Sequence, residues 1–159
     1  TIKIENGHLK GYNTDVYGFQ KSLQDFLTED FKAAALILGT GGAAKAVAYV
    51  LTKMDIPFKY VSRSSKENNL TYKDLNANTI IDYSLIINTT PLGMYPKVAA
   101  APDLPYDALT SEHFLYDLVY NPPLTLFLQH GKSRDAAVAN GLEMLHLQAE
   151  KAWEIWNNS

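Results

Sequence analysis

A short apolar run that ends in glycines constrains the fold more than any other part of this chain. Residues 33–38 read Ala-Ala-Ala-Leu-Ile-Leu, pass directly into Gly-Thr-Gly-Gly, and are followed by an alanine-rich stretch over 43–54. A continuous apolar run of this length is typical of a strand covered on both faces of a parallel sheet, and alanine favours helix. The pattern therefore predicts a strand, a tight turn and a helix, which together form the first unit of an α/β domain.

The turn itself has the spacing of a dinucleotide-binding motif, Gly39-x-Gly41-x-x-Ala44. The first glycine allows the tight turn, the second lets the backbone approach a diphosphate without an intervening Cβ, and the small third residue lets the helix pack against its strand. The unpaired N–H groups at the helix N-terminus favour phosphate binding. We therefore expect a dinucleotide here, and the alternative is a glycine turn that serves packing alone.

The rest of the pattern extends this unit into a larger sheet. Asn6-Gly7 between two alternating segments predicts a β-hairpin, and apolar residues at helical spacing over 16–27 predict a helix. Four further apolar runs predict strands, at 58–61, 85–87, 114–118 and 136–139. The predicted fold class is α/β, a Rossmann-like doubly wound parallel sheet with helices on both faces, preceded by the hairpin and ending in an amphipathic helix.

The closing amphipathic helix is expected over residues 142–156. Its apolar stripe is expected to consist of Leu142, Leu145, Ala149, Ala152, Trp153 and Trp156. On this pattern alone we interpret the two tryptophans as core residues.

The residues after the second predicted strand favour a phosphorylated coenzyme. A unit that binds NAD carries an acidic residue roughly 20 positions beyond the glycines, where it holds the ribose 2′-hydroxyl. Here residues 62–66 read Ser-Arg-Ser-Ser-Lys, and Glu67 is the first acid. The Arg63 guanidinium can bind a 2′-phosphate through paired hydrogen bonds, whereas a carboxylate would repel it. The sequence thus predicts NADP(H) rather than NAD, and the alternative is a solvated polar loop.

Composition excludes several other classes of function. The 14 Lys and Arg against 17 Asp and Glu give a net charge of −3, so we expect no nucleic-acid partner. The absence of cysteine and the scattering of four single histidines predict no disulfide and no metal site. The apolar runs are far shorter than the ~18 residues of a membrane span, so no membrane partner is expected. These features fit a reducing cytoplasm, which is the expected location.

Further motifs, in this order along the chain, carry a resemblance to a known family. They are Gly11-Tyr-Asn-Thr-Asp15 with Gly18-Phe19, the glycine turn, Ser62-Arg-Ser64, Ile87-Asn-Thr-Thr-Pro-Leu-Gly-Met94, Asp117-Leu-Val-Tyr-Asn-Pro122, and Gly141-Leu-Glu-Met-Leu-His-Leu-Gln-Ala149. Together they resemble the shikimate dehydrogenases, NADP-dependent enzymes of aromatic amino-acid (chorismate) biosynthesis. The resemblance implies an oxidoreductase that interconverts 3-dehydroshikimate and shikimate, with NADP as cofactor and shikimate or 3-dehydroshikimate as the small-molecule substrate.

The resemblance also implies roles for individual residues. The coenzyme diphosphate is expected on Gly39, Gly41, Gly42 and Ala43, and the adenosine ribose phosphate on Ser62, Arg63 and Ser64. The nicotinamide side is expected to be lined by Asn88, Thr89, Thr90, Pro91, Met94, Val119, Gly141 and Met144. The substrate hydroxyls are expected to contact Asn13, Asp15, Tyr120 and Gln148. Without the resemblance, Asp15 would be interpreted as a helix cap, Tyr120 as a strand end, and Gln148 as a helix surface residue.

The family carries a preceding N-terminal substrate domain, whose lysine would pair with the catalytic Asp15 in proton transfer. None of the lysines of this chain lies in that lysine motif, and the chain opens at Thr1 rather than Met. We therefore expect residues 15–141 to form the NADP-binding domain, and 1–14 and 142–159 to adjoin the substrate domain. This chain alone should bind NADP(H) better than it turns over shikimate.

The two adjoining segments should then expose apolar side chains, Trp153 and Trp156 among them, and drive self-association. Two other functions stay open: a stand-alone, non-catalytic NADP-binding module, and an NAD-dependent quinate/shikimate dehydrogenase.

Overall fold

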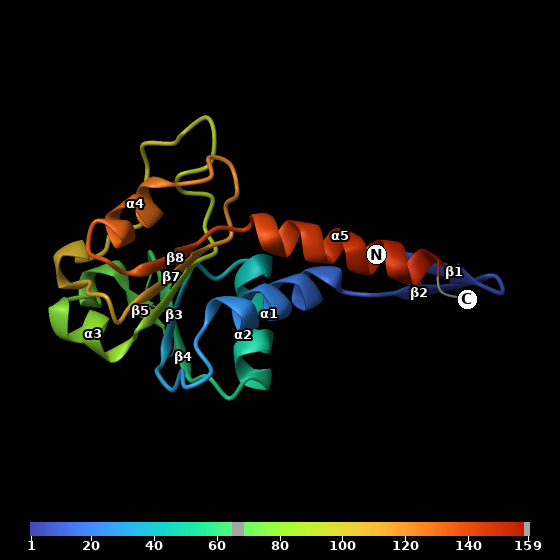
Figure 1. The fold of residues 1–159 in the computed structure, drawn as a ribbon, viewed down its shortest axis with the longest axis horizontal. Helices are drawn as coiled ribbons and strands as arrows, with labels where there is room; N and C mark the ends of the chain where they lie inside the picture. Colours follow the sequence, from blue (N-terminus) through green and yellow to red (C-terminus); the bar gives the residue numbers. More distant parts are fainter. Residues whose placement is uncertain (65–68, 158–159) are drawn as a thin grey trace.

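A six-stranded parallel sheet forms the centre of the molecule, as a computed structural model that describes residues 1–64 and 69–157 shows (Figure 1). Its strands are β3 (Ala35–Leu38), β4 (Phe58–Ser62), β5 (Leu70–Thr71), β6 (Leu85–Asn88), β7 (Phe114–Asp117) and β8 (Ala137–Ala139). They lie in the order β5-β4-β3-β6-β7-β8, and every neighbouring pair is parallel. The strand order therefore reverses between β3 and β6, which confirms the predicted doubly wound, Rossmann-like sheet.

Helices cover both faces of this sheet. They are α1 (Thr14–Phe26), α2 (Gly42–Lys53), α3 (Ala77–Asp82), α4 (Leu126–Lys132) and α5 (Leu142–Asn157), with short 3₁₀ turns at Tyr72–Asp74 and Tyr106–Ala108. Helices α1 and α2 and Met144 of α5 pack on one apolar cluster, and α3 and α4 pack on the other. The two clusters lie on opposite faces of the sheet.

Strand β3 shows why its sequence is continuously apolar. Ala35 and Ile37 contribute to the cluster under α1 and α2, while Leu36 and Leu38 contribute to the cluster under α3 and α4. All four side chains are fully buried. Because successive residues of a strand point to opposite faces, both faces need apolar side chains when helices cover both.

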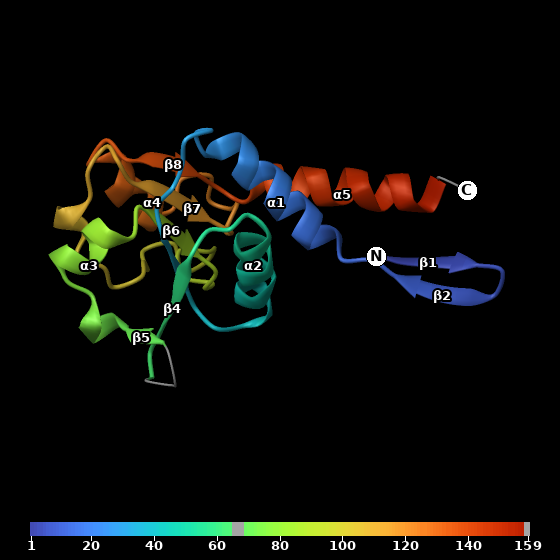
Figure 2. The same ribbon diagram turned by 90° about the horizontal axis from the view of Figure 1, so that it is seen from below.

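The hairpin and the far half of α5 extend away from the sheet in the same direction (Figures 1 and 2). Strands β1 (Ile2–Glu5) and β2 (His8–Gly11) pair antiparallel around Asn6 and Gly7, whose φ angles of 50° and 79° suit the tight turn that Asn-Gly predicts. The Trp156 indole Nε1 donates a hydrogen bond to the Ile2 carbonyl over 3.0 Å and joins α5 to the hairpin. Ile4 and Leu9 are largely exposed.

The packing face of α5 differs from the predicted stripe. Ala152 is buried, but Trp153 is 68% exposed and Trp156 is 56% exposed, and Leu142 and Ala149 also lie on the exposed side. The interpretation of the tryptophans as core residues is therefore wrong, whereas the exposure expected from the family resemblance is confirmed. The physical reason is that α5 packs chiefly along α1 instead of across the sheet.

Glycine allows the close approach of these two helices. A Cβ on Gly18 of α1 would lie 2.5 Å from the Met144 carbonyl oxygen of α5. Among the helices of residues 1–64 and 69–157, none combines the length and the hydrophobicity of a membrane-spanning segment.

Candidate functional site

The glycine turn lies at the carboxyl end of β3, beside the point where the strand order reverses. Gly39 has a φ of +110°, a backbone conformation that residues with a side chain rarely adopt. Its N–H donates to the Val61 carbonyl of the neighbouring β4 over 2.8 Å. A Cβ on Gly39 would lie 2.8 Å from the Thr89 hydroxyl. Glycine is thus required at this position by the backbone itself.

The next two glycines have a different environment. Gly41 and Gly42 are exposed, and a Cβ on either would meet no heavy atom within 4 Å. Gly41 is the N-cap of α2, and no side chain caps the N–H groups of the first turn. Ala44, in contrast, is fully buried against the sheet. The turn therefore offers uncapped N–H groups on an open surface, which fits the diphosphate of a dinucleotide.

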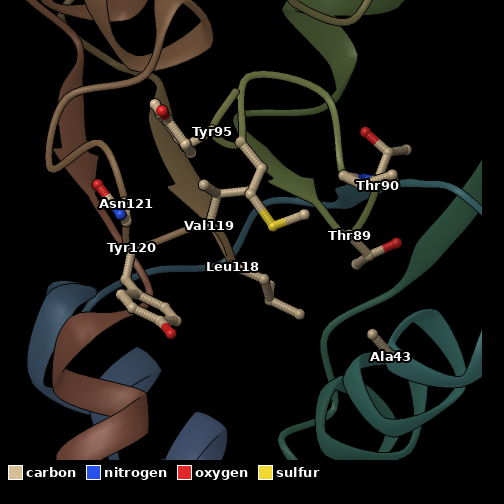
Figure 3. Close-up of a pocket in the computed structure, with 10 residues that line it drawn as sticks. Ala43, Thr89, Thr90, Tyr95, Leu118, Val119, Tyr120 and Asn121 are labelled. Atoms are coloured by element: carbon tan, nitrogen blue, oxygen red, sulfur yellow. The ribbon is translucent and has the colours of Figure 1, made fainter. Parts of the chain in front are cut away.

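A hollow of about 460 Å³ opens beside this turn at the carboxyl ends of β6 and β7 (Figure 3). Ala43 and Thr89 lie at one side of it, Tyr120 and Asn121 lie at the other, and Leu118 is between them. The lining is completed by Thr90, Pro91, Met94, Tyr95 and Val119. Ligands of doubly wound sheets bind in such crevices, outside the strand ends at the reversal of strand order.

This hollow gathers seven residues that the sequence singled out: Ala43, Thr89, Thr90, Pro91, Met94, Val119 and Tyr120. Three lining residues were not predicted, namely Tyr95, Leu118 and Asn121. Leu118 and Asn121 lie inside the Asp117–Pro122 motif, so that motif could have indicated them. Tyr95 follows the motif that ends at Met94, and no signal in the sequence marks it.

Asn88 is not part of the lining. Its side chain is fully buried, donates to Asp117 Oδ1 over 2.9 Å, and accepts hydrogen bonds from the backbone N–H and the hydroxyl of Thr90 at 3.0 and 2.7 Å. It therefore shapes the loop that lines the hollow. Burial raises the pKa of the Asp117 carboxyl, and hydrogen bonds from Thr125, Val119 and Asn88 oppose that rise.

Gly141 and Met144 lie behind the hollow instead of among its lining residues. The Gly141 N–H donates to the Val119 carbonyl over 3.3 Å, and a Cβ on Gly141 would lie 2.1 Å from the Leu118 carbonyl oxygen. Met144 is half-buried against the core under α1. Gly141 thereby supports the segment from which Leu118 and Val119 face the hollow.

The predicted binding residues for the adenosine end lie at the carboxyl end of β4, next to β3. Ser62 is buried and its hydroxyl donates to the Ser64 carbonyl, while Arg63 and Ser64 are exposed. Burial raises the pKa of the Tyr72 hydroxyl, and the Arg63 guanidinium lies close enough to oppose that rise. Ser65, Lys66 and Glu67 lie outside the described residues.

Three of the four predicted substrate residues lie around a second hollow of about 690 Å³, between the start of α1 and the middle of α5. It contains Asn13, Asp15 and Gln148, whereas Tyr120 faces the first hollow. Asn13 caps α1 by accepting a hydrogen bond from the Val16 N–H over 3.2 Å. The residues that line this second hollow, all of which the structure describes, include no lysine.

A third hollow, of about 490 Å³, links the glycine turn to the second one. Gly42 and Asn13 both line it, together with Val16, Lys45, Ala46 and Tyr49. Since Asn13 also lines the second hollow, the candidate sites for diphosphate and substrate are neighbours. In the part of the chain that the structure describes, no group of three His, Cys, Asp or Glu residues could hold a metal ion.

Comparisons with known proteins identify similar sequences and folds. A comparison with models of protein families found no match. Among curated proteins, the chain is 42% identical over 163 residues to the shikimate dehydrogenase (NADP+) of Clostridium beijerinckii, covering 98% of this chain and 60% of that protein. It is 38% identical over 170 residues to the corresponding protein of Methanococcus maripaludis, covering 98% and 61%.

A solved structure extends the likeness to the fold. Shikimate 5-dehydrogenase of Thermus thermophilus, in complex with NADP(H) and shikimate, superposes with a TM-score of 0.81 at 30% identity. The match covers 96% of this chain and 59% of that structure. The chain thus spans about 60% of the length of the curated relatives that it matches. In sequence and in fold, the chain is therefore similar to shikimate dehydrogenases over about 60% of their length.

Proposed function

We propose that this chain is the coenzyme-binding part of an NADP-dependent shikimate dehydrogenase, an enzyme that interconverts 3-dehydroshikimate and shikimate. The observation that carries the proposal is the hollow at the ends of β6 and β7, which opens beside the uncapped glycine turn of β3 and α2. Two similar proteins also support the proposal, because their names specify NADP+. The similar Thermus thermophilus structure was solved with NADP(H) and shikimate.

The residues present fit NADP(H). The open surface over Gly41 and Gly42 leaves space for a diphosphate that a Cβ would restrict. We assign the diphosphate to Gly39, Gly41, Gly42 and Ala43, and the 2′-phosphate to Ser62, Arg63 and Ser64. The nicotinamide belongs in the first hollow, against Thr89, Thr90, Pro91, Met94 and Val119, with Asn88, Gly141 and Met144 supporting that lining from behind. When bound, the coenzyme supplies or accepts the hydride.

The substrate side of the proposal uses the second hollow. Asn13, Asp15 and Gln148 lie around it and can hydrogen-bond hydroxyl groups. We also assign Tyr120, which lines the first hollow, to the substrate hydroxyls. Asp15, in the first turn of α1, is proposed to orient the group that moves a proton at the reacting oxygen. In the family that group is a lysine of the substrate domain.

The coenzyme and substrate assignments divide the chain into two parts. We propose that residues 15–141 form the NADP-binding domain, and that residues 1–14 and 142–159 adjoin the substrate domain. The hairpin supports this division, because a two-stranded hairpin is only marginally stable without a covering partner and its strands are mostly exposed here.

The test is a titration of the 159-residue chain with NADP+ and NAD+, followed by an assay of shikimate oxidation on the same sample. We expect saturable NADP+ binding, weaker NAD+ binding, and little turnover by this chain alone. Equal or tighter binding of NAD+ would contradict the coenzyme assignment and favour an NAD-dependent quinate/shikimate dehydrogenase. Rapid turnover by this chain alone would contradict the assignment of the proton-transfer lysine to the substrate domain.

A further inference from the structure

We infer that Asp117, buried behind the first hollow, is a positioning residue that fixes the lining of the nicotinamide site through Asn88 and Thr125. The inference rests on the proposed function, because it takes the first hollow as the place of the nicotinamide. Asp117 itself is fully buried and does not line the hollow, so it acts through other residues.

Three hydrogen bonds converge on the Asp117 carboxylate from three parts of the chain. Oδ1 accepts from the Asn88 side chain over 2.9 Å and from the Val119 N–H over 3.0 Å. Oδ2 accepts from the Thr125 hydroxyl over 2.6 Å. Val119 lines the hollow, so one of these bonds holds a lining residue directly.

The bond to Asn88 extends the network to the opposite loop. Asn88 is held by Asp117 through its amide nitrogen, and its amide oxygen receives two hydrogen bonds from Thr90, a lining residue. The amide orientation is therefore fixed, since the carboxylate can only accept and the Thr90 N–H can only donate. Asp117 thus sets the positions of both Val119 and Thr90, which belong to loops after different strands.

The bond to Thr125 adds the segment that carries Met94 and Tyr95. Thr125 is fully buried, caps α4 by accepting from the Leu128 N–H, and packs beside Gly93, where an added Cβ would lie 3.3 Å from the Thr125 Cβ. Gly93 has a φ of +86° and precedes the two lining residues. A change at Thr125 is therefore transmitted to the same hollow.

The groups that hydrogen-bond to the Asp117 carboxylate are all neutral, and the carboxylate suits the positioning role because it accepts several of these bonds at once. Among the described residues, no salt bridge involves Asp117. A buried carboxylate that accepts several hydrogen bonds at once fixes more donors than an amide could, because an amide has only one oxygen. Buried networks of this kind specify a single local arrangement when every member is satisfied, and no buried polar side-chain atom among the described residues lacks a partner.

The experiment compares two ligands on the same variants of the 159-residue chain: NADP+, and adenosine 2′-phosphate-5′-diphosphate, which lacks the nicotinamide and its ribose. The variants are Thr125→Val, which removes the hydroxyl at nearly constant shape, Thr125→Ser, which keeps it, Asp117→Asn and Asp117→Ala. Thr79→Val is the matched control, because its hydroxyl bonds the Asp74 carbonyl near α3 and no residue there lines the first hollow.

We expect Thr125→Val and Asp117→Ala to weaken NADP+ binding by about tenfold, as for loss of a buried charge-assisted hydrogen bond, while binding of the truncated ligand changes by less than about twofold. Asp117→Asn, which keeps one oxygen for Asn88 and Val119, should fall between wild type and Asp117→Ala. Thr125→Ser should restore NADP+ binding, and Thr79→Val should match wild type.

A purely structural role would give a different pattern. Equal weakening of both ligands, or unchanged NADP+ affinity in folded Thr125→Val, would overturn the inference. If Asp117→Ala fails to fold, the Thr125 pair decides alone. Failure of the wild-type chain to bind NADP+ would instead overturn the proposed function, so the two failures are distinguishable.

Discussion

The hydroxyl of Thr89 lies where a side chain on Gly39 would have to be. The distance from Thr89 Oγ1 to a Cβ placed on Gly39 is 2.8 Å, and the same hydroxyl donates to the Leu38 carbonyl over 2.6 Å. The contact joins the ends of β3 and β6, the two strands between which the strand order reverses. The coenzyme turn and the loop that lines the first hollow are therefore held by one close packing contact.

This contact predicts opposite effects for two glycine substitutions. Gly39→Ala should lower the free energy of unfolding by about 2 kcal/mol or more, because it adds a clash to a strained φ. Gly42→Ala should leave the stability unchanged within about 0.5 kcal/mol, since the space is open and alanine favours helix. It should still weaken NADP+ binding by placing a methyl group on the phosphate-binding surface.

Chemical denaturation and an NADP+ titration of both variants check these expectations. A Gly42→Ala protein that is stable and binds NADP+ like wild type would contradict the position of the diphosphate.

Arg63 is expected to set the preference for NADP+. Arg63→Gln should weaken NADP+ binding by roughly ten- to a hundredfold, the effect of losing one charge-assisted contact to the 2′-phosphate. NAD+ affinity should be unaltered because NAD+ lacks that phosphate. Isothermal titration with both coenzymes measures the two effects. Arg134→Gln is the control, since Arg134 pairs with Asp107 away from the hollows. A parallel loss of both coenzymes in Arg63→Gln would rule out a specific 2′-phosphate contact.

Tyr116 predicts a loss of stability in alkali. Burial raises the pKa of its hydroxyl from the ordinary 10.0 to about 12, a net rise that the 2.6 Å hydrogen bond with Ser22 only partly opposes. The folded state therefore favours the protonated form. The stabilisation is fully present below pH 10 and is lost as the pH rises through about 12, by at most about 3 kcal/mol.

Urea unfolding between pH 9 and 12 on wild type and Tyr116→Phe tests this. At neutral pH the free energy of unfolding of the variant should be lower by about 1 kcal/mol, because the hydrogen bond to Ser22 is missing. In alkali this free energy should decline less than that of the wild type. An identical alkaline decline in both proteins would exclude Tyr116 as a source.

The exposed tryptophans predict self-association of this chain. Trp153 and Trp156 lie near the C-terminal end of α5 and are exposed, and Trp156 hydrogen-bonds the hairpin at Ile2, while Ile4 and Leu9 of the hairpin are also exposed. Apolar groups gathered at one end of a protein favour association. Trp153→Lys should therefore shift the monomer–oligomer equilibrium toward monomer in sedimentation velocity. Ile81→Lys, at an exposed position on α3, is the control and should behave like wild type. Monomeric wild type at high concentration would refute this expectation.

The parts of the fold that were predictable have strong local signals. The run over 33–38 predicted β3, and the structure begins it at Ala35 because the first two alanines lie before the sheet pairing. Asn6-Gly7 predicted the hairpin and the position of its turn. The short elements β5, α3 and α4 were not predicted individually, since two to seven residues are too few to show a period.

Sequence periodicity and motifs do not show which neighbouring residues a side chain packs against, and this limits what could be predicted for α5 and for Asn88. Residues 142–157 have helical periodicity, but α1 determines which side of α5 is covered, through the close approach at Gly18. Asn88 belongs to a motif expected on the coenzyme, yet the fully buried Asp117 draws its side chain inward. Asp117 itself carries no sequence signal of burial, because an acid at a strand end usually faces solvent.

A crystal structure of this chain with NADP+ bound would show the coenzyme site itself. We expect the diphosphate oxygens against the N–H groups of residues 41–43, the Arg63 guanidinium on the 2′-phosphate, and the nicotinamide in the first hollow beside Thr90 and Val119. A dinucleotide bound elsewhere, with the glycine turn free of phosphate and Arg63 directed to solvent, would contradict this expectation.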